Sequence, residues 1–279
     1  MNRVWLALSG AFAAVLLCGH AAQAGCAADP QPCTFALGSY HLILPADADP
    51  AKPLPAVMFL HGWGGNGAST IKNTGMMSVI QQRGYAMIAP DGLMDAEANG
   101  GSWDFHPDYP GKRDEMAFLK GVADDAAKRF GIDRGRILLA GFSIGGSMTS
   151  YIACEDPGAF AAYAPVAGSF WRPHPAACAG PVRLLHTHGW RDATVPLEGR
   201  SFNSGAFAQG DVFQAMEIWR AANRCGKAMP QDFDAIGIYW LRRWTGCAEG
   251  AALEFALHEG AHGIPKGWAT LALDWFEGL

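Results

Sequence analysis

The sequence predicts an α/β fold in which helices cover both faces of a mostly parallel central sheet. Short apolar runs that end near glycine alternate along the chain with segments of helical periodicity. The 35 glycines among 279 residues also indicate many tight turns, which favours an α/β or all-β fold over a helical bundle. No linker, repeat or low-complexity segment interrupts this pattern, so we expect residues 25–279 to form one domain.

The expected strands are short and strongly apolar. Continuous apolar runs of this kind are typical of strands buried on both faces of a parallel sheet. In chain order, they are Leu54–Leu60, Ala86–Ala89, Ile137–Ala140, Val182–Leu185 and the alternating segment Leu253–Leu257.

The expected helices lie between or after these strands. In the segment Asp114–Phe130, Leu119, Val122 and Ala126 recur at helical spacing, and Gly131 then predicts the end of the helix. Further helices are expected at Gly146–Cys154, Val212–Asn223 and Trp268–Phe276.

Composition excludes some classes of protein. Apolar residues make up 50% of the chain and charged residues 17%, which is incompatible with a mostly disordered chain. The net charge is −5 and no run of Lys or Arg is present, so we expect no nucleic-acid partner.

The first 24 residues have the pattern of a cleaved signal peptide. Arg3 precedes the apolar run Val4–Leu17, and Ala22 and Ala24 place small residues at positions −3 and −1 of a cut before Gly25. A membrane anchor and a lipoprotein signal at Cys18 are the alternatives. We expect a secreted or periplasmic protein with no membrane segment after cleavage.

The mature chain keeps an even number of cysteines, as expected of disulfides in an exported protein. Since each pair closes a short loop, the expected bridges join nearest neighbours, although the sequence alone leaves other pairings open. These bridges are Cys26–Cys33, Cys154–Cys178 and Cys225–Cys247. Zinc ligation is the competing interpretation of these cysteines, but no C-x-x-C pair is present.

A candidate nucleophile lies directly after an expected strand. The segment Gly141-Phe142-Ser143-Ile144-Gly145 matches G-x-S-x-G and precedes an expected helix. In this strand–turn–helix context, the two glycines make room for a strained turn that presents the serine hydroxyl above the sheet.

A candidate acid and a candidate base follow Ser143 in the chain. His262 lies in a loop after the last strand and is the candidate base for Ser143. Asp192 follows the preceding strand and is the candidate that orients His262. The order Ser–Asp–His is the order of the α/β-hydrolases.

The segment His61-Gly62-Trp63-Gly64-Gly65 is the candidate oxyanion hole. Glycines let backbone amides point at a developing negative charge. The expected donors are the amides of Trp63 and of Ile144, the residue after the nucleophile.

Two other functions are alternatives to a serine esterase. The segment from His258 to His262 also matches H-E-x-x-H, a zinc-hydrolase signature. That signature requires a helix, which Gly260 and Pro265 disfavour. A non-catalytic binding protein of the same fold is the other alternative. His186 and His188 could form a ligand pair but are expected to be packed or hydrogen-bonded residues.

From Ser39 to its C-terminus, the chain resembles the secreted polyhydroxybutyrate depolymerase and feruloyl/acetylxylan esterase group of the α/β-hydrolases. The segments that carry the resemblance are Tyr40–Pro45, His61–Asn66, Ala89–Gly92, Gly141–Met148, Ala164–Gly168, His188–Pro196 and Gly260–Pro265. It implies ester hydrolysis through an acyl-enzyme, with Ser143, His262 and Asp192 in the roles above.

The sequence departs from the group in two places. Ile264 stands where a Trp-Pro pair commonly follows the histidine, and Trp190 replaces a smaller residue. The substrate is therefore not carried over from the resemblance.

Aromatic residues in the loops are the remaining indication of the substrate. Trp63, Trp103, Phe105, Trp171 and Trp190 are expected near the strand ends, where they either stack on a phenolic or sugar group or pack the loops. We expect a monomer without cofactor or metal that acts on feruloyl, acetyl or hydroxyalkanoate esters.

Overall fold

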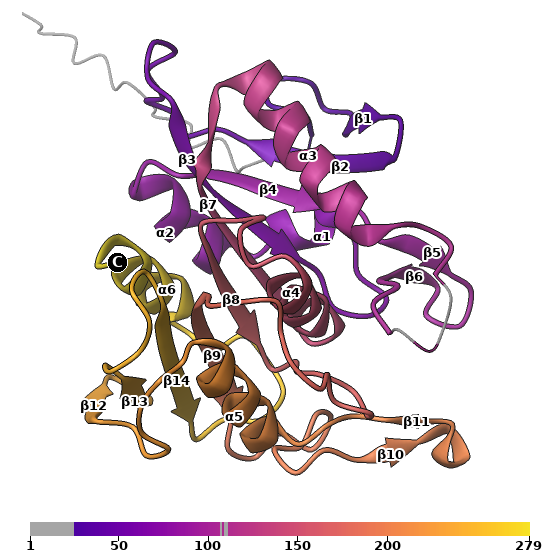
Figure 1. Cartoon of the computed structure of the whole chain (residues 1–279). Coiled ribbons are helices and arrows are strands. Elements are labelled where there is room, and N and C mark those ends of the chain that lie inside the picture. The colour runs from indigo at the N-terminus through magenta and orange to yellow at the C-terminus, as the bar shows by residue number, and fades with distance from the viewer. Residues whose placement is uncertain (1–24, 107, 109–110) are drawn as a thin grey trace, which may run out of the picture.

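The computed structural model describes residues 25–106, 108 and 111–279. The expected signal peptide, residues 1–24, lies outside the described residues. Figure 1 shows one extended sheet with helices packed against it. In the described part of the chain, none of the helices is long and apolar enough to span a bilayer.

The main sheet has ten strands among the described residues, in the order β1-β2-β4-β3-β7-β8-β9-β14-β13-β12. Their bounds are β1 (Cys33–Phe35), β2 (Gly38–Ile43), β3 (Leu54–Leu60), β4 (Ala86–Pro90), β7 (Ile132–Phe142), β8 (Ala162–Val166), β9 (Arg183–Gly189), β12 (Asp232–Ile236), β13 (Tyr239–Trp244) and β14 (Ala252–His258). The central strands β4, β3, β7, β8, β9 and β14 are parallel, and the outer strands add antiparallel pairs at both edges.

The smaller elements lie in the connections. The helices are α1 (Gly67–Ile71), α2 (Thr74–Gln82), α3 (Glu115–Phe130), α4 (Ile144–Glu155), α5 (Val212–Ala222) and α6 (Trp268–Glu277). The short hairpins are β5 (Leu93–Asp95) with β6 (Gly100–Ser102), and β10 (Ser201–Phe202) with β11 (Phe207–Ala208). The β10–β11 hairpin projects from the body of the molecule (Figure 1).

The strands separate two hydrophobic cores. Along β3, Met58 and Leu60 enter the core shared with α3, α4 and α5. Val57 and Phe59 enter the core shared with α1, α2 and α6. Each face is therefore covered by helices, which confirms the predicted fold class.

Local sequence signals explain the helix ends. Asp114 caps α3 by accepting a hydrogen bond from the amide of Ala117 at 2.9 Å. Gly131 ends that helix in the left-handed conformation with φ of 70°. The predicted stop at Gly131 is thus confirmed.

Apolar and polar residues alternate in β14, although the strand is buried almost throughout. Glu254 is buried, although alternation is typical of a strand with one exposed face. Arg243 on the adjacent strand β13 donates a hydrogen bond to Glu254 at 2.7 Å. The antiparallel β12–β13 hairpin covers this edge of the parallel sheet, and the ion pair compensates the buried carboxylate.

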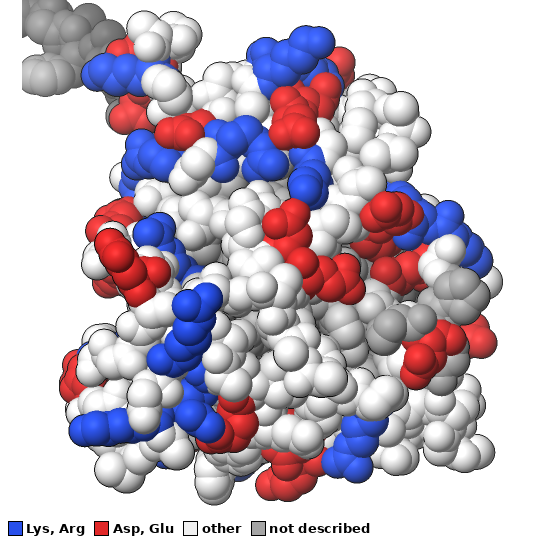
Figure 2. Space-filling view, viewed as in Figure 1, with Lys and Arg blue, Asp and Glu red and all other residues white. Residues whose placement is uncertain are grey.

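Charges are mixed on the face shown in Figure 2, where acidic and basic side chains lie side by side around an uncharged centre.

The structure contains the disulfides Cys26–Cys33, Cys154–Cys178 and Cys225–Cys247. These are the nearest-neighbour pairs. Cys154 is in the last turn of α4, the helix that follows Ser143. Its bridge therefore ties α4 to the segment that leads into β9.

Removing the Cys154–Cys178 bridge should lower thermal stability. The bridge closes a loop with a sequence separation of 24, for which chain entropy predicts about 3 kcal/mol of stabilisation. We expect the double variant Cys154→Ala/Cys178→Ala to melt several degrees below the oxidised protein in calorimetry. An unchanged melting temperature would contradict a stabilising role.

Candidate active site

The strained turn at Ser143 joins β7 to α4. Ser143 has φ of 58° and ψ of −121°, a conformation that residues other than glycine rarely adopt. The amide of Ser143 donates to the carbonyl of Val166 on β8 at 2.9 Å, which holds the turn against the sheet.

The flanking glycines are required by close contacts. A Cβ atom at Gly141 would lie 2.3 Å from the carbonyl oxygen of Gly145, and one at Gly145 would lie 2.4 Å from that of Leu60. Any side chain at either position would push the strand and helix apart. The G-x-S-x-G spacing thus follows from the packing of this turn.

His262 connects the serine to an acid. Its Nε2 lies 3.0 Å from Ser143 Oγ, and its Nδ1 lies 2.8 Å from Asp192 Oδ2. Since a carboxylate only accepts hydrogen bonds, Nδ1 carries the proton and Nε2 is free to accept the serine proton. The ring of Phe142 packs on the imidazole with centroids 4.8 Å apart.

Asp192 is buried and strongly hydrogen-bonded. Its Oδ1 accepts from the amides of Thr194 and Val195 at 2.9 and 2.8 Å. Burial opposes ionisation, but the hydrogen bonds from His262 and Val195 outweigh it, so the pKa of Asp192 lies below its ordinary value. The acid is therefore a carboxylate at neutral pH.

Two buried histidines support the acid loop from within β9. His188 Nε2 donates to the carbonyl of Val195 at 2.8 Å, and His186 Nε2 lies 3.1 Å from His188 Nδ1. Burial lowers the pKa of both histidines, which keeps them neutral. They act as hydrogen-bonding residues of the loop, as expected from their position.

Main-chain hydrogen bonds bring the acid and base loops together. The amide of Trp190 donates to the carbonyl of His258 at 2.7 Å, and the amide of Arg191 donates to that of Gly260 at 3.0 Å. These bonds continue the parallel pairing of β9 with β14 beyond the last paired residues, Gly189 and His258. Asp192 and His262 meet because their loops leave adjacent strands.

The loop His61–Gly65 is held rigidly beside Ser143. His61 Nε2 accepts from the amide of Gly92 at 2.9 Å, so its Nδ1 carries the proton and donates to the carbonyl of Gly62 at 2.8 Å. The amide of Gly64 donates to Gly101 at 2.9 Å. A Cβ atom at Gly62 would lie 3.5 Å from Ser143 Cβ, which places the loop next to Ser143.

The aromatic residues expected at the substrate have different environments. Trp103 is only 3% exposed, and its indole donates to the carbonyl of His61 at 2.9 Å, so it packs the loop and offers no face to a ligand. Phe105 is also buried. Trp171 packs among Phe105, Phe202 and Phe207. Trp63 and Trp190 are each 58% exposed.

The H-E-x-x-H segment does not form a helix. His258 is the last residue of β14, and its Nδ1 accepts from the amide of Gly260 at 3.1 Å. Within the described ranges, no group of at least three His, Cys, Asp or Glu side chains is arranged to hold a metal ion. The ring of His262 faces Asp192 and Ser143 instead.

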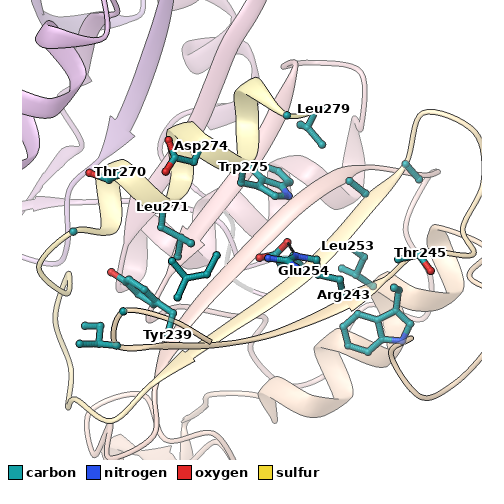
Figure 3. A pocket seen from close by; sticks show the side chains of 18 of the residues that line it. Tyr239, Arg243, Thr245, Leu253, Glu254, Thr270, Leu271, Asp274, Trp275 and Leu279 are labelled. Carbon is teal, nitrogen blue, oxygen red and sulfur yellow. Dashed lines mark hydrogen bonds and ion pairs between the residues drawn. The ribbon is translucent and has the colours of Figure 1, made fainter. Parts of the chain in front are cut away.

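One cavity lies away from these residues. It measures about 760 Å³ and lies between the β12–β13 hairpin, β14 and α6, as Figure 3 shows. Tyr239, Glu254 and Trp275 are among its lining residues. A second cavity of about 390 Å³ adjoins the loop His61–Gly65 and Phe142.

Sequence comparison identifies the family. Residues 45–208 match the profile of the phospholipase/carboxylesterase family. The chain belongs to this family. It is a serine esterase of the α/β-hydrolase group, a carboxylic ester hydrolase.

The chain is also similar to individual proteins and solved structures. Feruloyl esterase C of Emericella nidulans is 25% identical over 237 residues, 82% of this chain and 77% of the relative. Acetyl xylan esterase from Aspergillus awamori shares the fold with a TM-score of 0.64 at 15% identity, covering 86% and 94% of the two chains. A Mesorhizobium loti carboxylesterase has a TM-score of 0.58 at 19% identity, covering 89% and 98%.

Some residues of the site were not predicted from the sequence. The stacking of Phe142 on His262 was not expected, although its place beside Ser143 in the motif was a signal. The hydrogen bonds from Gly92 to His61 and from Gly64 to Gly101 could not be predicted from the sequence. Gly92 and Gly101 lie in a different connection of the chain.

The lowered pKa of Asp192 predicts a pH-dependent contribution to stability. Because its folded pKa lies below the unfolded value of about 3.9, its contribution is complete above that pH and is lost as the pH falls through the folded pKa. We expect the free energy of unfolding of wild type to exceed that of Asp192→Asn most near neutral pH. Urea denaturation at a series of lower pH values should show the difference shrinking; a difference that keeps its neutral-pH value down to the lowest pH measured would contradict this.

Proposed function

We propose that Ser143, His262 and Asp192 are the catalytic residues of this esterase. The observation that carries the proposal is the continuous hydrogen-bonded chain from Asp192 through His262 to the Ser143 hydroxyl, with distances of 2.8 and 3.0 Å. No separate activator of the serine is needed in this arrangement.

In the proposed acylation step, His262 Nε2 takes the Ser143 proton while Oγ bonds to the ester carbonyl carbon. The imidazolium that forms is stabilised by the Asp192 carboxylate. Collapse of the tetrahedral intermediate breaks the bond to the alkoxy oxygen, which receives the proton from Nε2 and leaves as an alcohol. Water then attacks the acyl-enzyme with His262 as base and releases the carboxylic acid.

The proposed oxyanion donors are the amides of Trp63 and Ile144. Ile144 is the first residue of α4, where amides have no acceptor within the helix and the helix dipole favours negative charge. Trp63 follows Gly62, which lies beside Ser143. Because the donors are backbone groups, replacing the Trp63 indole would leave its amide in place.

We further propose feruloyl or acetyl esters of polysaccharides, or hydroxyalkanoate esters, as substrates. The feruloyl and acetyl xylan esterase relatives support the first class. The exposed indoles of Trp63 and Trp190 are surfaces on which an aromatic or sugar ring can stack.

We propose that the protein is exported after removal of residues 1–24 and that residues 25–279 act as a monomeric catalytic domain. The disulfides support an oxidising compartment, because such bonds persist outside the cytosol. The leader pattern of Arg3, Val4–Leu17 and Ala22–Ala24 supports export.

The variant Ser143→Ala should lower kcat by on the order of 10⁴–10⁶, since it removes the nucleophile. Its melting curve should stay close to that of wild type, because the turn and its glycines are unchanged. Mass spectrometry after fluorophosphonate treatment should place the adduct on the peptide containing Ser143. Retained activity, or an adduct elsewhere, would refute the assignment.

Initial rates should separate the substrate classes. We expect turnover of methyl ferulate or 4-nitrophenyl acetate to exceed that of 3-hydroxybutyrate oligomers, because Trp63 and Trp190 offer stacking surfaces for rings. Faster turnover of the oligomers would favour the hydroxyalkanoate class. Equal and trivial rates on all three would show that the substrate class is wrong.

A further inference from the structure

Phe142 is the last residue of β7 and directly precedes Ser143. Side chains alternate between the two faces along a strand, and Phe142 packs against the same hydrophobic core as Ala140. Ile264, two residues after His262, packs against this core as well. The strand therefore directs the Phe142 ring to the face of the sheet on which the His262 loop lies.

The ring of Phe142 contacts the imidazole of His262. The two ring centroids lie 4.8 Å apart, with 39° between the ring planes. Asp192 and Ser143 hold the imidazole only through its two nitrogen atoms. Two such hydrogen bonds leave the ring free to tilt about the line that joins their partners. A contact on the ring face opposes this tilt, which would turn the Nε2 lone pair away from the Ser143 hydroxyl.

The Phe142 ring is itself held in place. A Cβ atom at Gly62 would lie 3.1 Å from Phe142 Cδ1, so the ring packs closely against the backbone of the loop His61–Gly65. The half-buried ring thus contacts both His262 and the loop that supplies a proposed oxyanion donor. These two contacts restrict its orientation.

The contact with Phe142 becomes more favourable as the proposed reaction proceeds. In the acylation step His262 takes the Ser143 proton and becomes an imidazolium. A cation within about 6 Å of an aromatic ring centroid is attracted by the negative charge on the ring face. The separation of 4.8 Å is within this range. Such an interaction stabilises the transition state more than the ground state, so it raises kcat without tightening substrate binding.

We propose that Phe142 is a positioning residue of the active site. Its ring keeps the His262 imidazole directed at Ser143 and stabilises the imidazolium that forms when the serine proton is taken. This inference rests on the proposed function, because it takes His262 as the base.

The test compares variants in the hydrolysis of 4-nitrophenyl acetate. Phe142→Leu removes the ring, and Phe142→Tyr keeps it. Pentafluorophenylalanine in place of Phe142 keeps a flat ring, but its fluorine atoms withdraw the negative charge from the ring face. Phe276→Leu is the matched control, because Phe276 is also half-buried and packs against the same core, where its ring contacts Tyr85.

We expect Phe142→Leu to lower kcat about tenfold while KM changes by less than about twofold. Because the imidazolium loses stabilisation, the base is protonated only at lower pH. The acid limb of the kcat/KM pH profile should therefore move to lower pH by about half a unit.

The other variants separate the contributions of the ring. The pentafluorophenylalanine protein should show a lower kcat and the same shift of the acid limb, and it carries the test if Phe142→Leu fails to fold. Phe142→Tyr should keep wild-type values. Phe276→Leu should lower the melting temperature but leave kcat and the acid limb unchanged.

The titratable side chains around His262 are the same in all of these proteins. Among the described residues, Asp192 and the neutral His188 interact with the imidazole, and His258 interacts with Asp192. A shift of the acid limb in the Phe142 variants therefore reports the contact between the two rings.

Other outcomes overturn the proposal. Wild-type kcat and an unmoved acid limb in folded Phe142→Leu would show that the ring does not position the base. A raised KM with unchanged kcat would assign Phe142 to substrate binding instead. An unmoved acid limb in the pentafluorophenylalanine protein would refute the stabilisation of the imidazolium, and an equal shift in Phe276→Leu would show a general effect of core packing.

Failure of the proposed function gives a different result. If wild type hydrolyses no ester, or if Ser143→Ala retains activity, the proposed function on which the inference rests is refuted, whatever the Phe142 variants show.

Discussion

The strained turn at Ser143 is the constraint on which the rest of the site depends. Its positive φ can be maintained only because β7, β8 and α4 fix the chain on both sides. Gly141 and Gly145 allow these elements to approach to distances that exclude a Cβ atom. The turn places the hydroxyl at the carboxyl end of β7 and begins α4 at Ile144. The positions of the proposed nucleophile and of the proposed oxyanion donor at Ile144 thus have one structural cause.

The other parts reach this point through neighbouring strands. The acid loop and the base loop leave β9 and β14, and main-chain hydrogen bonds from Trp190 and Arg191 join them beyond the sheet. Behind Asp192, His188 and His186 continue the hydrogen bonding into the core. The carboxylate is consequently buried but not isolated, which explains why its pKa falls despite the cost of burial.

The space around the triad follows from the same arrangement. The loop His61–Gly65 follows β3 and the loop of His262 follows β14, on opposite sides of β7 in the sheet, and residues of both loops line one cavity. In the proposed reaction, the carbonyl oxygen of a bound ester faces the amides of Trp63 and Ile144, and its leaving oxygen faces His262 Nε2.

The sequence by itself determined local features: the strands β3, β4, β7, β9 and β14, the helices α3 to α6, the stop at Gly131, the turn signal around Ser143 and the chain order of Ser143, Asp192 and His262. Each depends on a few consecutive residues, whose backbone preferences are set by their own side chains. Only the tertiary structure decided which side chains meet, because the contact between Asp192 and His262 depends on the register of β9 with β14. It also decided that Trp103 is buried, since the indole's partner is a carbonyl 42 residues away.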